Sequence, residues 1–213
     1  QLVLERLKSY FPSHGIVAEE SGLHESTSDY RWYVDPLDGT SNFTAGLPYF
    51  CVSLALLVEG LPQVGMVYDP VRDECFMAQR GKGAWLNGIS MGTMATLGLP
   101  LQRCIAVVDF KRLKPNLAQK LVASPPFASQ RNFGASTLDW CYVAAGRFNL
   151  YLHGGQKLWD YAAGSLILAE AGGSMCTLTE DDFGAGNLWQ RSVIAALNPD
   201  LFNAWKAWIR NRQ

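Results

Sequence analysis

The sequence predicts an α/β (α+β) fold with a strand-rich first half, and three observations indicate it. Apolar runs of strand length follow one another between residues 51 and 79, with Glu59-Gly60 as a turn signal. After residue 105, runs of strand length alternate with runs of helical spacing. The 213 residues, 48% of them hydrophobic, can bury a large core. We expect a single unit over residues 1–213, with sub-regions of about 1–100 and 101–213.

The first elements predicted are a helix and two short strands. Apolar residues recur at helical spacing over residues 2–11, and Pro12 with Ser13 ends this helix. Residues 15–18 form an apolar run of strand length, and residues 32–34 end another. Because Pro36 fixes its own φ and lacks an N–H donor, we expect the second strand to end before it. Asp35 and Asp38 would then project from the turn that follows.

The later elements follow the same patterns. Residues 51–59, 61–69 and 74–79 predict an antiparallel meander. Residues 105–110 predict a strand, and residues 116–122 a short helix. The remaining predictions are helices over 137–147, 161–171 and 199–210, and strands over 150–152, 175–178 and 193–196.

Composition excludes several classes of protein. The net charge of −1 and the absence of a basic stripe argue against binding to a nucleic acid polymer. The longest apolar stretches, such as residues 50–58, are too short to cross a bilayer, and no signal segment opens the chain. The five cysteines are scattered singly, so we expect them to be reduced. We therefore expect a cytoplasmic protein without a membrane partner.

The run from Asp35 to Phe43 has the chemistry of a cation and phosphate site. Asp35 and Asp38 are three residues apart, and their repulsion is costly unless a cation lies between them. Carboxylates without nearby His or Cys favour Mg²⁺, Mn²⁺ or Ca²⁺ over Zn²⁺. Gly39-Thr40-Ser41 can open a helix whose first N–H groups face an anion. The alternative is an ordinary turn with Thr40 or Ser41 as the helix N-cap.

Two further acidic segments accompany this run. Glu19-Glu20 follows the predicted strand over residues 15–18, and Asp160 lies at the start of an Ala-rich apolar helix. Asp160 could equally be a simple N-cap. The combination is more informative than any one segment, because hard cations are bound by several carboxylates.

These segments, in this order, resemble the inositol monophosphatase family of Mg²⁺-dependent phosphatases. The resemblance implies a layered α-β-α-β-α sandwich of the inositol monophosphatase / fructose-1,6-bisphosphatase type, and a homodimer. It extends over nearly the whole chain. Its marks are Glu19-Glu20-Ser21, residues 35–43, Gly65 to Pro70, Gly81 to Gly88, and Trp159 to Gly164 followed by Glu170 to Gly173.

The resemblance implies two or three Mg²⁺ ions, with Mn²⁺ as a substitute and Li⁺ and Ca²⁺ as inhibitors. Glu19, Asp35 and the carbonyl oxygen of Leu37 would hold one ion. Asp35, Asp38 and Asp160 would hold a second ion, so that Asp35 bridges the two. Such a pair clamps the attacking and leaving oxygens of a phosphoryl displacement.

The resemblance also implies roles toward water and phosphate. Glu19 and Thr40 would orient and activate the attacking water. The N–H groups of Gly39 and Thr40 would bind phosphate oxygens. The implied activity is hydrolysis of a small phosphorylated metabolite, a polyol or sugar phosphate resembling inositol 1-phosphate. Alternatives are a 3′(2′),5′-bisphosphate nucleotidase, a histidinol-phosphate phosphatase, or a non-catalytic regulatory relative.

Substrate selection is expected around residues 134–153. Gly134 and Ser136 match the loop that faces the leaving group, although Ser136 or Thr137 could be an ordinary N-cap. His153 stands seven residues before Asp160, where inositol-specific members have a Glu, and this departure argues against inositol phosphate. His153 could bind substrate, or be a surface or strand-end residue.

Members of the family also have a helical segment ahead of the position of Leu2, with a Lys and a Thr-x-x-Asp that helps to bind a further metal ion. The sequence begins with Gln1, already inside the helix that should follow. Either residues ahead of Gln1 are left out of this sequence, or the protein lacks the segment; if the protein lacks it, we expect the third metal position to be missing as well.

Overall fold

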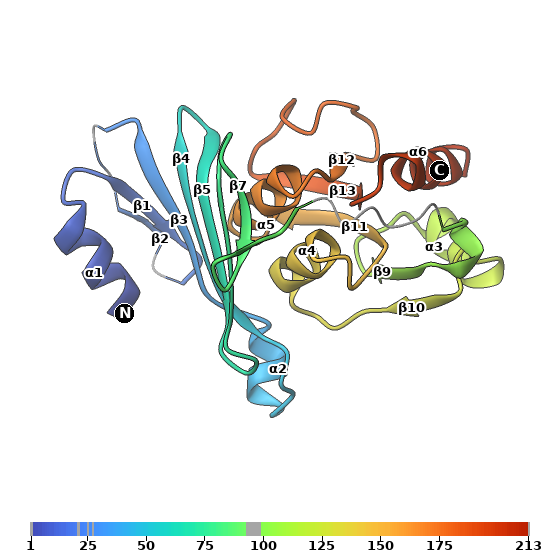
Figure 1. Ribbon diagram of the computed structural model, residues 1–213, viewed down its shortest axis with the longest axis horizontal. Coiled ribbons are helices and arrows are strands. Elements are labelled where there is room, and N and C mark those ends of the chain that lie inside the picture. Colours follow the sequence, from blue (N-terminus) through green and yellow to red (C-terminus); the bar gives the residue numbers. More distant parts are fainter. Residues whose placement is uncertain (1, 21, 25, 27, 93–98, 213) are drawn as a thin grey trace.

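The computed structural model describes residues 2–20, 22–24, 26, 28–92 and 99–212, so Ser21 of the first acidic motif lies outside the described residues. Figure 1 shows two sheets with a helical layer between them and helices outside each, which confirms the predicted α-β-α-β-α sandwich. Helix α1 (Leu2–Tyr10) covers the outer face of the first sheet. No helix among the described residues is long and apolar enough to cross a membrane.

Within the described residues, the first sheet has eight strands in the order β2-β1-β3-β4-β5-β6-β7-β8. The predicted antiparallel meander is confirmed as β4, β5 and β6. Strand β1 is parallel to β3, with Ala18 opposite Val34. The strands are β1 (Gly15–Ala18), β2 (Gly22–His24), β3 (Tyr30–Asp38), β4 (Cys51–Val58), β5 (Leu61–Asp69), β6 (Glu74–Gln79), β7 (Gly83–Leu86) and β8 (Ile89–Ser90).

Strand β3 does not end before Pro36, so this prediction is wrong. The strand continues to Asp38, with Asp35 opposite Ser53 and Asp38 opposite Cys51 on β4. An advance of three residues along β3 therefore corresponds to two residues along β4, and the extra residue of β3 forms a β-bulge. Pro36 lies within this irregularity, where the ladder does not need its missing N–H. Asp35 and Asp38 belong to the strand itself rather than to the turn after it.

The second sheet has five strands in the order β10-β9-β11-β13-β12. Strand β11 extends beyond the predicted residue 152, because Gly154 and Gly155 are accommodated as a register shift rather than ending the strand. Strand β10 was not predicted. The strands are β9 (Ile105–Asp109), β10 (Ser129–Arg131), β11 (Leu150–Lys157), β12 (Ser174–Cys176) and β13 (Gln190–Ala196).

Helices pack on both faces of this second sheet. Helices α4 (Ser136–Ala144) and α5 (Leu158–Glu170) form the central layer, and α3 (Pro115–Ala123) and α6 (Pro199–Arg210) form the outer one. Helices α4 and α5 approach closely at Gly164, where a Cβ atom would lie 2.4 Å from the Cβ of Trp140. The described part of the chain also contains the short helix α2 (Thr40–Thr44) and the 3₁₀ turn η1 (Leu101–Arg103).

The cysteines are free, as expected. Four of them are buried and Cys75 is partly exposed. The central layer packs into the main core, which joins the facing sides of both sheets through fully buried residues such as Trp140 and Val193. The position of the acidic residues is therefore set by a continuous packed interior.

Candidate metal and phosphate site

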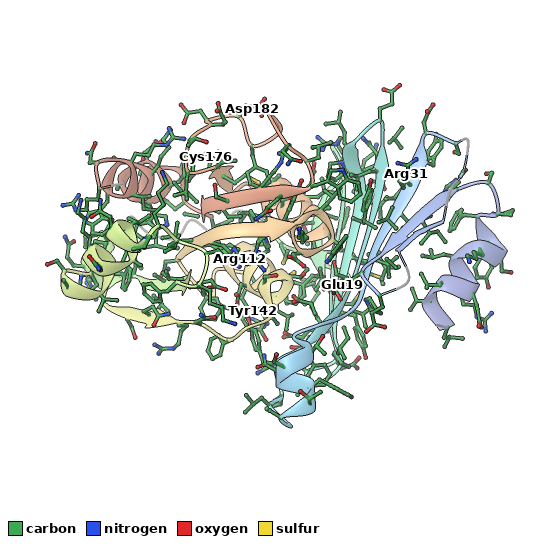
Figure 2. The ribbon with its side chains drawn as sticks, turned by 180° about the vertical axis from the view of Figure 1, so that it is seen from behind. Glu19, Arg31, Arg112, Tyr142, Cys176 and Asp182 are labelled. Carbon is green, nitrogen blue, oxygen red and sulfur yellow. The ribbon has the colours of Figure 1, made fainter. Side chains whose placement is uncertain are left out.

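The parallel pairing of β1 and β3 places two of the predicted acidic residues side by side. Glu19 directly follows β1, and its N–H donates to the carbonyl of Val34, at 3.2 Å. Asp35 is the next residue of β3 and is buried, whereas Glu19 is exposed. Figure 2 shows Glu19 where the first sheet adjoins the helical layer. Sheet topology therefore brings together carboxylates that are 16 positions apart in the sequence.

Backbone N–H groups fix the two aspartates of β3. The Leu37 N–H donates to Oδ1 of Asp35 at 3.0 Å. The Thr137 N–H, in the first turn of α4, donates to Oδ2 of Asp38 at 2.6 Å. Hydrogen bonds of this kind orient carboxylates without neutralising them. Thr137 was not predicted as a site residue except as a possible N-cap, because its partner is 99 positions away.

Asp160 is held in a similar way by its own helix. It is the third residue of α5, whose N-cap is Lys157, so the interpretation of Asp160 as an N-cap is wrong. Its Oδ2 accepts the Lys157 N–H at 2.8 Å, and its carbonyl accepts the hydroxyl of Thr137 at 3.1 Å. The first turns of α4 and α5 are thus tied together beside Asp38.

The three aspartates have raised pKa values because they are buried close to one another. Burial, followed by the charges of Asp38 and Glu19, raises the pKa of Asp35 to about 8. Burial also raises the pKa of Asp38 to about 6, although hydrogen bonds from Thr137 act in the opposite direction. Asp160, again chiefly through burial, has a pKa of about 6. These groups repel one another when ionised.

The chemistry of these donors fits a hard divalent cation. Among the described residues, no lysine or arginine forms an ion pair with Asp35, Asp38 or Asp160. Nor, within those residues, do three or more His, Cys, Asp or Glu side chains lie close enough to form a metal shell as they stand. The carboxylates are therefore grouped without being a complete coordination shell. Oxygen donors that repel one another are those that Mg²⁺ or Mn²⁺ would stabilise.

The turn at Gly39 requires glycine. Its φ is 90°, and a Cβ atom there would lie 2.9 Å from the carbonyl oxygen of Tyr49. Gly39 is the N-cap of α2, so the alternative with Thr40 or Ser41 as N-cap is wrong. The Thr40 hydroxyl instead donates to the carbonyl of Leu37 at 3.0 Å. The first N–H groups of this turn are free of partners within the helix and can bind an anion.

The predicted substrate residues lie on two elements. Gly134 is exposed, with φ of 78°. Ser136 is partly exposed and is the first residue of α4, whose N-cap is Ala135, so neither Ser136 nor Thr137 is the N-cap. Both residues precede the N–H that binds Asp38. Their contact with a substrate stays a prediction.

His153 is buried in β11, so its interpretation as a surface or strand-end residue is wrong. Its Nε2 lies 3.3 Å from Oδ2 of Asp109, and its Nδ1 accepts the N–H of Gly155 at 3.0 Å. The hydrogen bond from His153 lowers the pKa of Asp109. Both ring nitrogens therefore have partners within the protein, and a role of His153 in substrate binding stays a prediction.

The layered fold defines the class of protein, because the same architecture is found in solved inositol monophosphatases. The structure of inositol monophosphatase from Anabaena (Nostoc) sp. PCC 7120 superposes with a TM-score of 0.85 and 33% identity, over 98% of this chain and 83% of that one. The chain belongs to the inositol monophosphatase family, whose model matches residues 1–209.

Similar proteins in the family have two kinds of name. "Nus factor SuhB" of Pasteurella multocida is 41% identical in an alignment of 202 residues that covers 90% of this chain and 72% of the relative. The crystal structure of "extragenic suppressor protein suhB" from Bartonella henselae has a TM-score of 0.86 and 31% identity, over 98% of this chain and 80% of that one. The family thus includes relatives that are named for something other than phosphate hydrolysis.

Proposed function

We propose that this chain is a Mg²⁺-dependent phosphomonoesterase that hydrolyses a small polyol or sugar phosphate. One observation supports this most strongly. Asp35 and Asp38 are buried and lie with the partly buried Asp160 beside the helix start at Gly39, and no lysine or arginine of the described residues pairs with them. Membership of the inositol monophosphatase family supports the same reaction class.

Glu19, Asp35, Asp38, Asp160 and the Leu37 carbonyl would hold the ions. Divalent cations bound there would lower the pKa of a coordinated water molecule and neutralise negative charge on the reacting phosphate. The exposed carboxylate of Glu19 accepts a proton from the attacking water. Thr40 orients that water through its hydroxyl, and the N–H groups of Gly39 and Thr40 bind phosphate oxygens.

The test is phosphate release from a panel of phosphomonoesters, with Mg²⁺ and with a chelator. The panel contains inositol 1-phosphate, sugar phosphates, a 3′,5′-bisphosphate nucleotide and histidinol phosphate. We expect Mg²⁺-dependent release that Asp38→Asn removes. Asp181→Asn serves as a control, because Asp181 is 70% exposed and pairs with Lys206 and Arg210 on α6. Release that is equal in wild type and Asp38→Asn contradicts the proposal.

A second candidate function is a regulatory role without catalysis. The name "Nus factor" of several relatives favours it. The presence of all four acidic residues argues against it, since a chain without catalysis has no need to group these carboxylates around the two buried ones, Asp35 and Asp38. A well-folded protein that binds Mg²⁺ or Mn²⁺ but releases no phosphate from any compound of the panel would favour this second function.

A further inference from the structure

Asn42 joins three segments of the site that are distant in sequence. It lies in α2, and its side chain is buried, with 8% of its surface exposed. Its Nδ2 donates to the carbonyl of Tyr49 at 2.7 Å and to the carbonyl of Phe133 at 2.6 Å. Both amide protons are thus bound to backbone oxygens, one of them 91 positions away.

The second of these bonds fixes one end of the loop that leads into α4. The other end is fixed by the Thr137 N–H, which donates to Asp38. Between the two points lie only Gly134, Ala135 and Ser136. A short loop held at both ends has little freedom, and here both points of attachment belong to the Asp35 to Phe43 run.

The loop and the turn at Gly39 also fit together closely. A Cβ atom on Gly39 would lie 3.1 Å from the Cβ of Ala135. Gly134 has φ of 78°, and a Cβ on it would lie 3.6 Å from Nδ2 of Asn42. The side chain of Ala135 therefore lies against the turn at Gly39, and Gly134 lies against the side chain of Asn42.

A separate connection holds α4 in place. The Tyr49 hydroxyl donates to Oδ1 of Asp139 at 2.9 Å, and both residues are buried. Helix α4 is also packed against α5 in the main core. Loss of Asn42 would therefore leave α4, Thr137 and Asp38 where they are, and of the two attachments of the loop it would release the one at Phe133.

We infer that Asn42 is a positioning residue, which sets the place of residues 134–136 relative to the turn at Gly39. This inference rests on the proposed function, in which the turn binds phosphate and the loop faces the leaving group. Asn42 itself is buried and acts through these backbone contacts. Its loss should weaken substrate binding while the cation site, whose carboxylates are fixed by other groups, keeps its affinity.

The test compares Asn42→Ala with Asn87→Ala. Asn87 also bridges backbone groups, donating to the Asp73 carbonyl at 3.0 Å and accepting the Cys75 N–H at 2.7 Å, in the turn between β7 and β8. Of the two hydrogen bonds that Asn42→Ala removes, the one to Phe133 holds the loop, and we expect its loss to raise KM about tenfold. The affinity for Mn²⁺ should stay that of wild type. Asn87→Ala should lower stability without changing KM.

Hydrogen exchange gives a readout that does not depend on activity. Amides of residues 133–136 should exchange faster in Asn42→Ala than in wild type, and at the wild-type rate in Asn87→Ala. Asn42→Ser, whose hydroxyl can donate one bond, should be intermediate and serves if Asn42→Ala does not fold. If the amides of residues 133–136 exchange at the wild-type rate in Asn42→Ala and its KM is unchanged, the inference is overturned. A wild-type protein without phosphatase activity overturns the proposed function instead, and exchange and Mn²⁺ binding still decide the role of Asn42.

Discussion

Two acidic clusters in this molecule differ in how their charge is balanced. The unpaired cluster consists of Asp35, Asp38 and Asp160. The paired cluster consists of Asp69, Arg72, Glu74 and Arg147, where β5 and β6 meet α4. Both clusters contain buried carboxylates, but only the second contains cations of the protein.

The paired cluster shows that this fold can balance a buried carboxylate internally. Asp69 is fully buried, and its Oδ2 lies 3.0 Å from a guanidinium nitrogen of Arg72. Glu74 accepts two hydrogen bonds from Arg147, at 2.5 and 2.6 Å, and the guanidinium lies over the ring of Tyr142. No lysine or arginine in the described part of the chain plays this role at the unpaired cluster, which therefore points to a cation from solution.

The largest expected effect comes from the unpaired cluster. Asp35→Asn should lower kcat/KM more than about 100-fold, because loss of even an outer partner of a metal ligand costs about 10- to 100-fold. Steady-state phosphate release at saturating Mg²⁺ measures this. Should Asp35→Asn remain within a few fold of wild type, the two clusters would not differ in function.

The next effect concerns the turn that accompanies the unpaired cluster. Gly39→Ala should lower the free energy of unfolding by about 3 kcal/mol, since a left-handed backbone costs an alanine about 1 to 2 kcal/mol and the clash with Tyr49 adds to it. Gly46→Ala is the matched control, because Gly46 has φ of 73° and open space around it. It should cost about 1 kcal/mol. Equal losses in urea denaturation would show that the close fit at Gly39 is unimportant.

A further effect is expected from pH. The folded-state pKa values of Asp35, Asp38 and Asp160 lie above the ordinary value of 3.8, so their contribution to stability is full below that value. This stabilising contribution is lost as the pH rises past the folded-state pKa values, which are about 6 for Asp38 and about 8 for Asp35. The metal-free protein should therefore lose several kcal/mol of stability between pH 5 and pH 8.5, since each unit of raised pKa corresponds to about 1.4 kcal/mol.

Thermal unfolding with and without Mg²⁺ measures this effect. Mg²⁺ should raise the melting temperature more at pH 8.5 than at pH 5, because the cation replaces the protons. Asp38→Asn should flatten the pH dependence. A metal-free protein that becomes more stable as pH rises over this range would refute mutual repulsion as the property of the unpaired cluster.

The smallest effect is expected from the paired cluster. Arg147→Met should lower the free energy of unfolding by about 1 kcal/mol, because the Arg147–Glu74 pair is partly exposed and solvent screens it. The KM of Arg147→Met and its affinity for Mg²⁺ should be the same as those of the wild-type protein. Calorimetry and steady-state kinetics check both statements, and an altered affinity for Mg²⁺ would mean that the clusters are coupled.

The layered fold was predictable because family motifs span the chain, and the β4–β6 meander because its strands alternate with clear turn signals. The bulge at Pro36 was not predictable. Local sequence rules place the end of a strand at a proline, whereas the pairing with β4 continues past Pro36. Similarly, spacing identifies Asp35 and Asp38 as a pair. It cannot reveal that Thr137 binds Asp38 or that Asn42 reaches Phe133, because these contacts depend on how distant elements pack.

Calorimetric titration of the metal-free protein with Mn²⁺ and Mg²⁺ at pH 7 tests the central claim, that the unpaired cluster is a cation site, most directly. The cluster predicts binding with release of protons from the carboxyl groups whose pKa values are raised. It also predicts that Asp38→Asn weakens binding strongly and that Arg147→Met does not. No binding by the wild-type protein, or equal binding by wild type and Asp38→Asn, would contradict it.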